Sequence, residues 1–152
     1  MTTASGVTDR IARALLIRDV VSVRTEQGTV AAGVANFDDP LMRTAALFGM
    51  LGAQLTKPNL AVAEPTIDAA RAAVSSIAEM ELKPAALATL ASLRVASDNA
   101  AGDSIFQEAI AAAEAVGGDE QRAIAYTRIV DALNDRMLFL GQPVRGERTL
   151  PL

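Results

Sequence analysis

Residues 103–133, DSIFQEAIAAAEAVGGDEQRAIAYTRIVDAL, carry the pattern of two helices separated by a pair of glycines. In the first half, apolar residues recur at steps of three or four, as on one face of an α-helix. These residues are Phe106, Ala109, Ile110, Ala113 and Val116. Asp103 is a candidate N-cap, Gly117 can adopt the left-handed conformation that ends a helix, and Asp119 can cap the next helix. The stretch predicts an antiparallel helical hairpin, because so short a connection turns the chain back on itself.

The second half of this stretch begins the most regular apolar stripe in the sequence, with steps of 3, 4, 3, 4 and 3 residues. Its members are Ala123, Tyr126, Val130, Leu133, Met137 and Leu140. We therefore expect a helix that extends to about residue 140, with Tyr126 in the core. Leu138 and Phe139 either close the open end of the last hairpin or form an apolar patch that docks on another subunit.

Composition favours a single all-α domain. Of 152 residues, 51% are hydrophobic but only 3% are aromatic, and alanine is very frequent. Such a core is built by the close approach of helix backbones, not by large rings. The absence of cysteine excludes disulfides and is compatible with a cytoplasmic protein. No signal peptide or membrane span is expected, and the net charge of −4 argues against nucleic acid as a partner.

The sequence divides into three parts. Residues 1–7 are expected to form a flexible N-terminus, residues 8–140 a single helical-repeat domain, and residues 141–152 a flexible tail that contains two Gly and two Pro. The segment 20–35 fits two structures. In one, a first helix begins near Thr8 or Asp9 and carries Leu16, Val20 and Val23 on one face, with Ile17 and Val21 beside them, and a short helix follows over 29–37. In the other, VVSVRT and TVAAGVA form two strands of a β-hairpin.

Three proline sites predict further helix starts, because proline in the first helical turn loses no amide that is needed. They are Asp39-Pro40, Glu64-Pro65 and Lys83-Pro84. We expect a helix over 64–81 with Asp68 and Arg71 as an exposed pair, and a break near Asn99 and Gly102. The helix after Pro40 carries Leu41, Ala45, Phe48, Gly52 and Leu55 on one stripe. The stripes of the next two helices are Ile67, Ala70, Val74 and Ile77, and Leu87, Leu90, Leu93 and Ala96.

Gly49 and Gly52 interrupt the apolar stripe of the helix that begins at Pro40. Each costs roughly 1 kcal/mol of helix propensity relative to alanine. A neighbouring helix that packs closely against them explains their presence better than chance does.

Helix starts recur at Asp9, Asp39, Lys83 and Asp119, at intervals of 30, 44 and 36 residues. Helix pairs at such intervals are typical of α-solenoid repeats, and we expect about seven helices. In residues 100–109, which include AAGD and IFQEA, and in residues 119–133, the chain resembles the degenerate tetratricopeptide-like repeats common in bacterial proteins. The resemblance implies a right-handed superhelix of antiparallel hairpins whose inner surface binds a partner.

The sequence contains no recognisable catalytic, cofactor or metal site. Histidine and cysteine are absent, neither Lys57 nor Lys83 follows a serine by three residues, and no phosphate-binding loop follows a strand. The densest acidic sites are Asp38-Asp39 and Glu79 with Glu81. Helix caps and solvated helix ends explain them better than a catalytic pair or a hard-metal site does.

Arg13, Arg43 and Arg122 each follow an acidic residue by about one helical turn. The simple explanation is an intrahelical pair that contributes about 0.2–0.5 kcal/mol. The alternative is a row of arginines that lines a concave groove for an acidic or carboxyl-terminal peptide. Together with Leu138 and Phe139, these arginines are the predicted partner-binding residues.

These features predict an adaptor or scaffold that binds a partner protein or peptide. Two other functions remain. A self-assembling subunit would form homo-oligomers through its open ends. A small helical enzyme or ligand-binding domain would have a closed pocket in which a carboxylate and an arginine converge.

Overall fold

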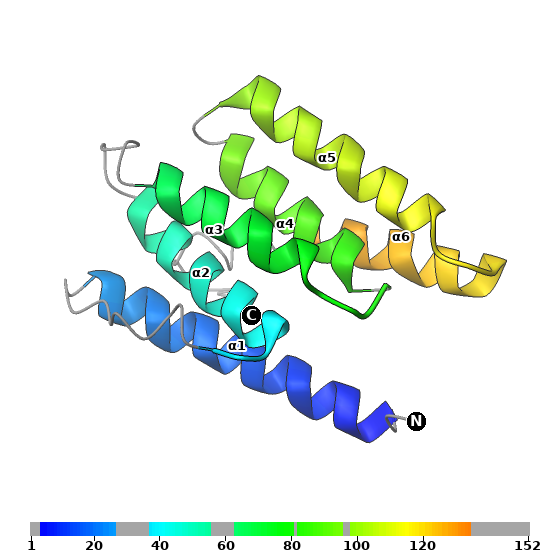
Figure 1. Ribbon diagram of the computed structural model, residues 1–152, viewed down its shortest axis with the longest axis horizontal. Helices are drawn as coiled ribbons and strands as arrows, with labels where there is room; N and C mark the ends of the chain where they lie inside the picture. The colour runs from blue at the N-terminus through cyan, green and yellow to red at the C-terminus, as the bar shows by residue number, and fades with distance from the viewer. Residues whose placement is uncertain (1–3, 27–36, 56–62, 81, 96–97, 135–152) are drawn as a thin grey trace, which may run out of the picture.

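The computed structural model describes residues 4–26, 37–55, 63–80, 82–95 and 98–134, with side chains from Asp9 onward. Over these ranges the chain forms six α-helices and no strand, which confirms the all-α prediction (Figure 1). The helices are α1 (Ala4–Glu26), α2 (Pro40–Leu55), α3 (Glu64–Ser75), α4 (Lys83–Val95), α5 (Asn99–Glu114) and α6 (Asp119–Asn134). The described residues contain six helices, whereas about seven were expected for the chain. The short helix expected over 29–37 lies outside the described residues, except for Phe37.

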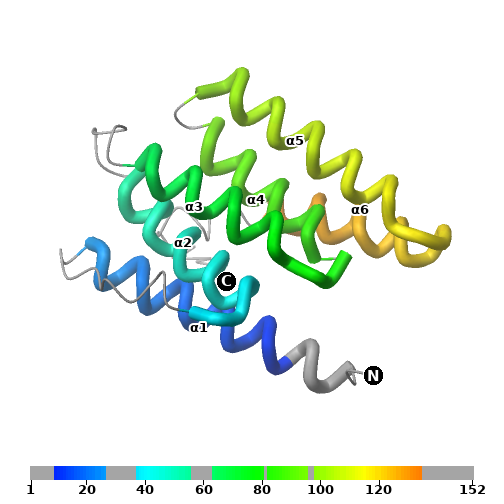
Figure 2. The backbone as a smooth tube through the Cα atoms, viewed as in Figure 1, coloured from blue at the N-terminus to red at the C-terminus, as the bar shows by residue number. Residues whose placement is uncertain are grey.

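The six helices run in two directions (Figure 2). α1, α2, α4 and α6 point one way, and α3 and α5 point the other way. α1 packs on α2, α2 on α4 and α4 on α6, while α3 contacts α2 and α4, and α5 contacts α4 and α6. α1 and α2 are therefore parallel neighbours. Antiparallel pairs, as predicted for residues 103–133, are found from α2 onward.

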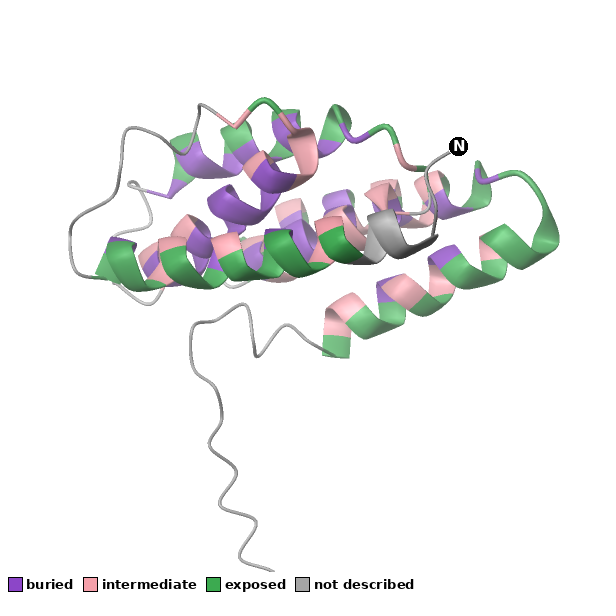
Figure 3. Ribbon diagram, turned by 90° about the horizontal axis from the view of Figure 1, so that it is seen from below, coloured by how far each residue is buried: buried purple, intermediate pink, exposed green. Residues whose placement is uncertain are grey.

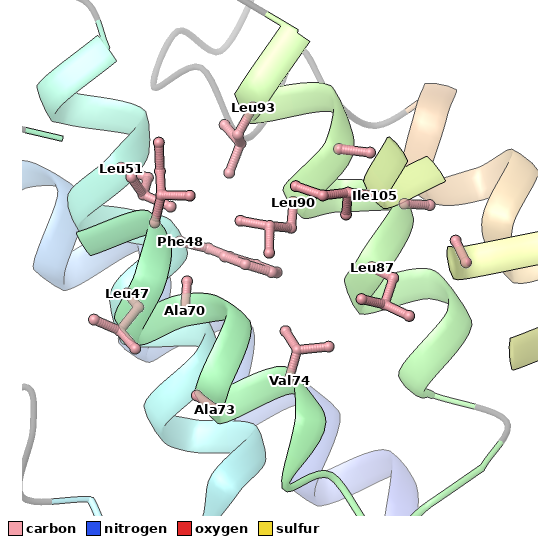
Figure 4. Packing of buried hydrophobic residues seen from close by; sticks show 14 of the residues in the cluster. Leu47, Phe48, Leu51, Ala70, Ala73, Val74, Leu87, Leu90, Leu93 and Ile105 are labelled. Carbon is pink, nitrogen blue, oxygen red and sulfur yellow. The ribbon is translucent and has the colours of Figure 1, made fainter. Parts of the chain in front are cut away.

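α2 and α4 form the centre of the core. Ten of the 16 residues of α2 are buried, which is more than a surface helix with one apolar face reaches. Figure 4 shows the ring of Phe48 in α2 pointing toward Leu90 of α4. Leu51, Leu90 and Leu93 are fully buried. Burial of each such side chain contributes about 1.5–3 kcal/mol.

The predicted helix starts in the middle of the chain are confirmed. α2 begins at Pro40, where the Asp39 carboxylate accepts a hydrogen bond from the amide of Leu41 at 2.9 Å. α3 and α4 begin at Glu64 and Lys83. The described residues of the two later stripes are buried: Ile67, Ala70, Val74, Ile77, Leu87, Leu90 and Leu93. In the stripe after Pro40, Leu41 and Leu55 are only partly buried. Ala96 lies outside the described residues.

Other helix ends differ from prediction. α1 begins at Ala4, before the expected start near Thr8, and it includes residues 20–26, which excludes a strand over VVSVRT. α3 ends at Ser75, whose neighbour Ser76 donates its amide back into the last turn, and does not continue to residue 81.

The start of α5 was predicted incorrectly. The N-cap is Asp98, whose carboxylate accepts a hydrogen bond from the amide of Ala101 at 3.1 Å, whereas Asp103 is exposed inside the helix. Residues 100–103 are therefore helical and do not form a turn. In the next loop the positive φ, 86°, belongs to Gly118 and not to Gly117.

The apolar stripe predicted for α6 faces the core only in part, through Tyr126 and Leu133. The buried residues are Ala125 and Ile129, while Val130 is 54% exposed and Ala123 is also exposed. Tyr126 is half-buried and packs against the core, as expected. α6 carries two apolar stripes, and its contacts with α4 and α5 decide which one is buried. Periodicity alone does not contain that information.

The stripe predicted for α1 is also exposed. Leu16, Val20 and Val23 are 65%, 45% and 53% exposed, and Figure 3 shows exposed residues along the outer side of this helix. Ile17 and Val21, which were expected beside this stripe, meet the core, and so does Ala14. The smaller Ala14 faces α2 because the two helices lie close together.

Two glycines allow backbones to approach closely. A Cβ atom at Gly49 would lie 2.2 Å from the carbonyl oxygen of Arg18 in α1, so the predicted close packing at Gly49 is confirmed. A Cβ atom at Gly102 would lie 2.9 Å from the backbone nitrogen of Val95 in α4. Gly102 is therefore a packing residue within α5, and the break predicted there is absent.

Replacement of Gly49 by alanine is expected to lower the free energy of unfolding by about 1–3 kcal/mol, the range for overpacking a filled interior. The new methyl group would meet a backbone carbonyl, which cannot rotate away as a side chain can. The gain in helix propensity, roughly 1 kcal/mol, offsets only part of this loss. Urea denaturation followed by circular dichroism measures the change.

Gly117→Ala is the matched control. No heavy atom lies within 4 Å of a Cβ built at Gly117, so the change should stay within about 0.5 kcal/mol. Equal losses for the two variants would contradict the close crossing of α1 and α2.

Candidate functional site

An open groove lies between α1 and α6, with α2 and α4 as its floor. Its volume is about 350 Å³. Among the described helices α1 and α6 make no contact with each other, which leaves the groove open between them. Most of the lining is apolar, and alanine is its commonest residue. Apolar lining residues include Ala14, Leu15, Ala45, Phe48, Ala85 and Ala132. A groove of this size falls within the range of known ligand pockets.

A few polar groups interrupt the apolar lining. Thr44 of α2 is only 2% exposed, and its Oγ1 atom is buried without a hydrogen-bond partner among the described residues. The Nη1 atom of Arg128 in α6 is likewise buried without a partner in this part of the chain. Both residues line the groove. A buried polar atom without a partner costs about 1–3 kcal/mol, so each favours an occupant that can form a hydrogen bond.

Arg10 forms a second polar cluster that joins three segments. Its Nη2 atom lies 2.9 Å from Oδ2 of Asp39 at the start of α2, and Nη1 pairs with Glu79 in the loop before α4. Hydrogen bonds to Glu79, which has the larger effect, and to Asp39 raise the pKa of the Arg10 guanidinium above its ordinary value. Because that value is already high, the cation persists across the physiological pH range. This cluster fixes the first turn of α2 relative to α1.

A smaller pocket of about 150 Å³ lies on the opposite side of α4, between α3 and α5. Its two arginines pair with carboxylates: Arg94 with Glu64, and Arg71 with Glu108 across from α3 to α5. Arg71 was expected to pair with Asp68, one turn away in its own helix. The pocket is smaller than typical ligand sites, and its ion pairs hold α3, α4 and α5 together.

The predicted arginines lie apart from the groove lining. Arg13 is exposed on α1, and Arg43 donates to the carbonyl oxygen of Phe37 at 2.9 and 2.6 Å. Arg122 pairs with Asp119 at 3.4 Å, as the simple explanation predicts. The other two predicted partner-binding residues, Leu138 and Phe139, lie outside the described residues.

The arginines that line the groove are Arg18 and Arg128, and the sequence analysis missed both. Neither follows an acidic residue by one turn, which was the criterion applied. A usable signal is present nevertheless. Each lies four residues from an alanine on the same helical face, Ala14 or Ala132, and both alanines line the groove.

Several acidic residues that the structure describes act as caps or ion-pair partners. Asp39 caps α2 and binds Arg10, as the cap interpretation predicts, and Glu79 is the other partner of Arg10. Within the described ranges, no group of three Asp, Glu, His or Cys residues is placed to hold a metal ion. None of the helices in these ranges has the combination of length and apolar character that crossing a membrane requires.

Replacement of Asp39 tests the two roles of its carboxylate. Asp39→Ala removes the cap and the ion pair, and should lower the free energy of unfolding by about 1–2 kcal/mol. Asp39→Asn keeps an acceptor for the Leu41 amide and loses only the charge, so its loss should be below about 1 kcal/mol because the pair is partly exposed. Both values come from urea denaturation. Equal losses would show that the cap contributes nothing.

The whole chain was also compared with known proteins. No protein-family model, curated protein or solved structure matches it. The case for a function therefore rests on the groove, its lining and the helices that form it.

Proposed function

We propose that this chain is a protein-binding module, an adaptor or scaffold, that receives an apolar segment of a partner in the groove between α1 and α6. The observation that carries the proposal is the apolar groove of about 350 Å³, whose walls do not meet. With neither cysteine nor histidine in the chain, we infer a cytoplasmic binding protein and not an enzyme.

The direction of the helices supports a tetratricopeptide-like arrangement. In this interpretation α2–α3 and α4–α5 are two helical hairpins, and α1 and α6 are first helices of the flanking repeats. All four helices that line the groove run in the same direction and pack in the order α1, α2, α4, α6. A layer of first helices forms the inner surface of such repeats, which is the surface that binds partners.

The lining favours a peptide occupant. Alanines along the floor leave room for large apolar side chains from a helix or extended segment. The Thr44 hydroxyl and the Arg128 guanidinium are placed to bind carbonyl or carboxylate oxygens of that segment. A binding mode with a few polar contacts in an apolar groove gives orientation as well as affinity.

A photo-crosslinking amino acid at Ala85 tests the proposal. Ala85 lines the groove, and Ala69 in α3 is an exposed control position on another helix. In extract of the source cell, the full-length chain modified at position 85 should capture one partner through an apolar segment. The yield of crosslinked partner from position 69 should be at least about tenfold lower. A tenfold difference in affinity corresponds to about 1.4 kcal/mol. Mass spectrometry identifies the crosslinked peptide.

A matched pair of substitutions supplies the control. Ala85→Arg places a long charged side chain in the groove and should abolish co-purification of the captured partner, while Ala69→Arg should not. Recovery of the same proteins from both crosslinking positions would contradict the proposal, as would the absence of any captured protein other than this chain.

Self-assembly is a second candidate function, and the exposed stripe on α1 favours it. Leu16, Val20 and Val23 expose large apolar side chains on one helix, and monomers rarely keep such surfaces contiguous. If the stripe is an interface, the sedimentation-derived mass should rise with concentration. Leu16→Glu combined with Val20→Glu should then restore the monomer mass without loss of stability. A monomer mass for the unmodified chain at every concentration would exclude this function.

A further inference from the structure

We infer that the groove between α1 and α6 is occupied by the chain's own C-terminal segment, with the apolar side chains of residues 137–140, MLFL, inserted into it. The inference rests on the groove of the proposed function and concerns the regulation of that groove. A partner that binds there must first displace residues 137–140.

The first argument is position. Asp131 and Ala132 of α6 line the groove, and Asn134 is the last described residue. Met137 follows Asn134 by three residues, which span about 10 Å at most. Met137 is therefore within reach of the groove wall without a long linker. With so short a tether, the effective concentration of the apolar run at the groove is in the millimolar range. Even a weak interaction therefore gives a populated docked state.

The second argument is chemistry. Exposure of four successive large apolar residues to water is unfavourable, and burial of their side chains would stabilise the docked state. The groove floor supplies small apolar partners such as Ala45, Ala85 and Ala86. Large side chains against a floor of alanines form a complementary surface, which the described helices themselves do not fill.

The third argument concerns hydrogen bonds. The sequence after Leu140 is GQP, and proline does not continue a helix, so a helix through the MLFL run must end there. The carbonyl groups in the last turn of a helix accept no hydrogen bond from an amide of the same helix. Arg128 and Thr44 supply groove-lining donors, Nη1 and the hydroxyl, that lack partners among the described residues. The segment thus offers carbonyl acceptors, and the groove lining offers hydrogen-bond donors.

Disulfide trapping in the full-length chain tests the inference, because the natural sequence contains no cysteine. One cysteine replaces Leu138, which leaves Met137, Phe139 and Leu140 intact. The second replaces Ala86 in the groove or, as the matched control, the exposed Ala69 on α3. A disulfide requires Cα atoms within about 7 Å of each other. Only a docked segment keeps the Cα atom of residue 138 within that distance of residue 86 for long enough to react.

The expected result is an intramolecular disulfide that forms at least about tenfold faster with Ala86→Cys than with Ala69→Cys, as measured by non-reducing electrophoresis at micromolar protein concentration. Equal rates would overturn the inference. A disulfide-linked dimer as the main product of the Ala86→Cys variant would also overturn it, because the occupant would then be a second copy of the chain.

A fluorescence measurement gives an independent readout, because the chain contains no tryptophan. Phe139→Trp in the full-length chain should emit at a shorter wavelength than the same residue in a free peptide of residues 135–152. Adding Ala85→Arg should move the emission back toward that of the peptide, and adding Ala69→Arg should not. Emission equal to that of the peptide in the folded protein would overturn the inference.

The two proposals fail separately. An intramolecular disulfide without a captured partner protein would contradict the proposed function and leave the docked segment standing. A captured partner together with equal disulfide rates would do the reverse.

Discussion

The close approach of helices through alanine and glycine faces is the constraint on which this structure depends. At Gly49, α2 comes so near to α1 that a single methyl group would meet the backbone of Arg18. Ala46 and Ala53 of α2 and Ala88 of α4 are fully buried. Helices with such faces pack backbone to backbone, and the larger leucines fill the spaces between pairs. With aromatic residues at only 3% of the chain, no other way of building a dense core is open to it.

The same constraint produces the groove. Small residues let α1 approach α2, and α6 approach α4, but they cannot bridge the wider space between α1 and α6. Ala14, Ala85 and Ala132 face that space with side chains too short to meet. On the other side of α4, long charged side chains close the equivalent space, since Arg71 reaches Glu108 and Arg94 reaches Glu64. One side of the helix layer is thus closed by ion pairs, while the other stays open and apolar.

The sequence predicts local features better than it predicts which face of a helix is buried. Helix starts at Pro40, Glu64 and Lys83 are encoded by a few adjacent residues, and the structure confirms them. The apolar stripes predicted for α1 and α6 did not fully match the buried faces of these helices. Each helix has two candidate faces, and packing against a distant helix decides which one is buried. Asp98 was overlooked in favour of Asp103 because both precede apolar runs at helical spacing.

The candidate site was harder to predict than the fold. Its alanines look like ordinary core residues in the sequence, and its two arginines do not follow an acidic residue by one turn, the feature that drew attention to Arg13, Arg43 and Arg122. What makes Arg18 and Arg128 notable is the empty space beside them, and that space exists only once four helices are in place. A cavity is a tertiary property, so periodicity along one helix does not reveal it.

The cost of the groove is itself an argument about its use. An apolar side chain at position 44 or 128 would fit the lining without leaving a buried polar atom unsatisfied, which costs about 1–3 kcal/mol. Native proteins satisfy most buried polar groups, and exceptions concentrate where another molecule or segment completes the site. Thr44 and Arg128 come from opposite elements of the groove, its floor and its wall, yet both present donors to the same space. An occupant with oxygen acceptors between apolar side chains would give both Thr44 and Arg128 a hydrogen-bond partner. A polypeptide segment has such acceptors in its backbone carbonyl groups.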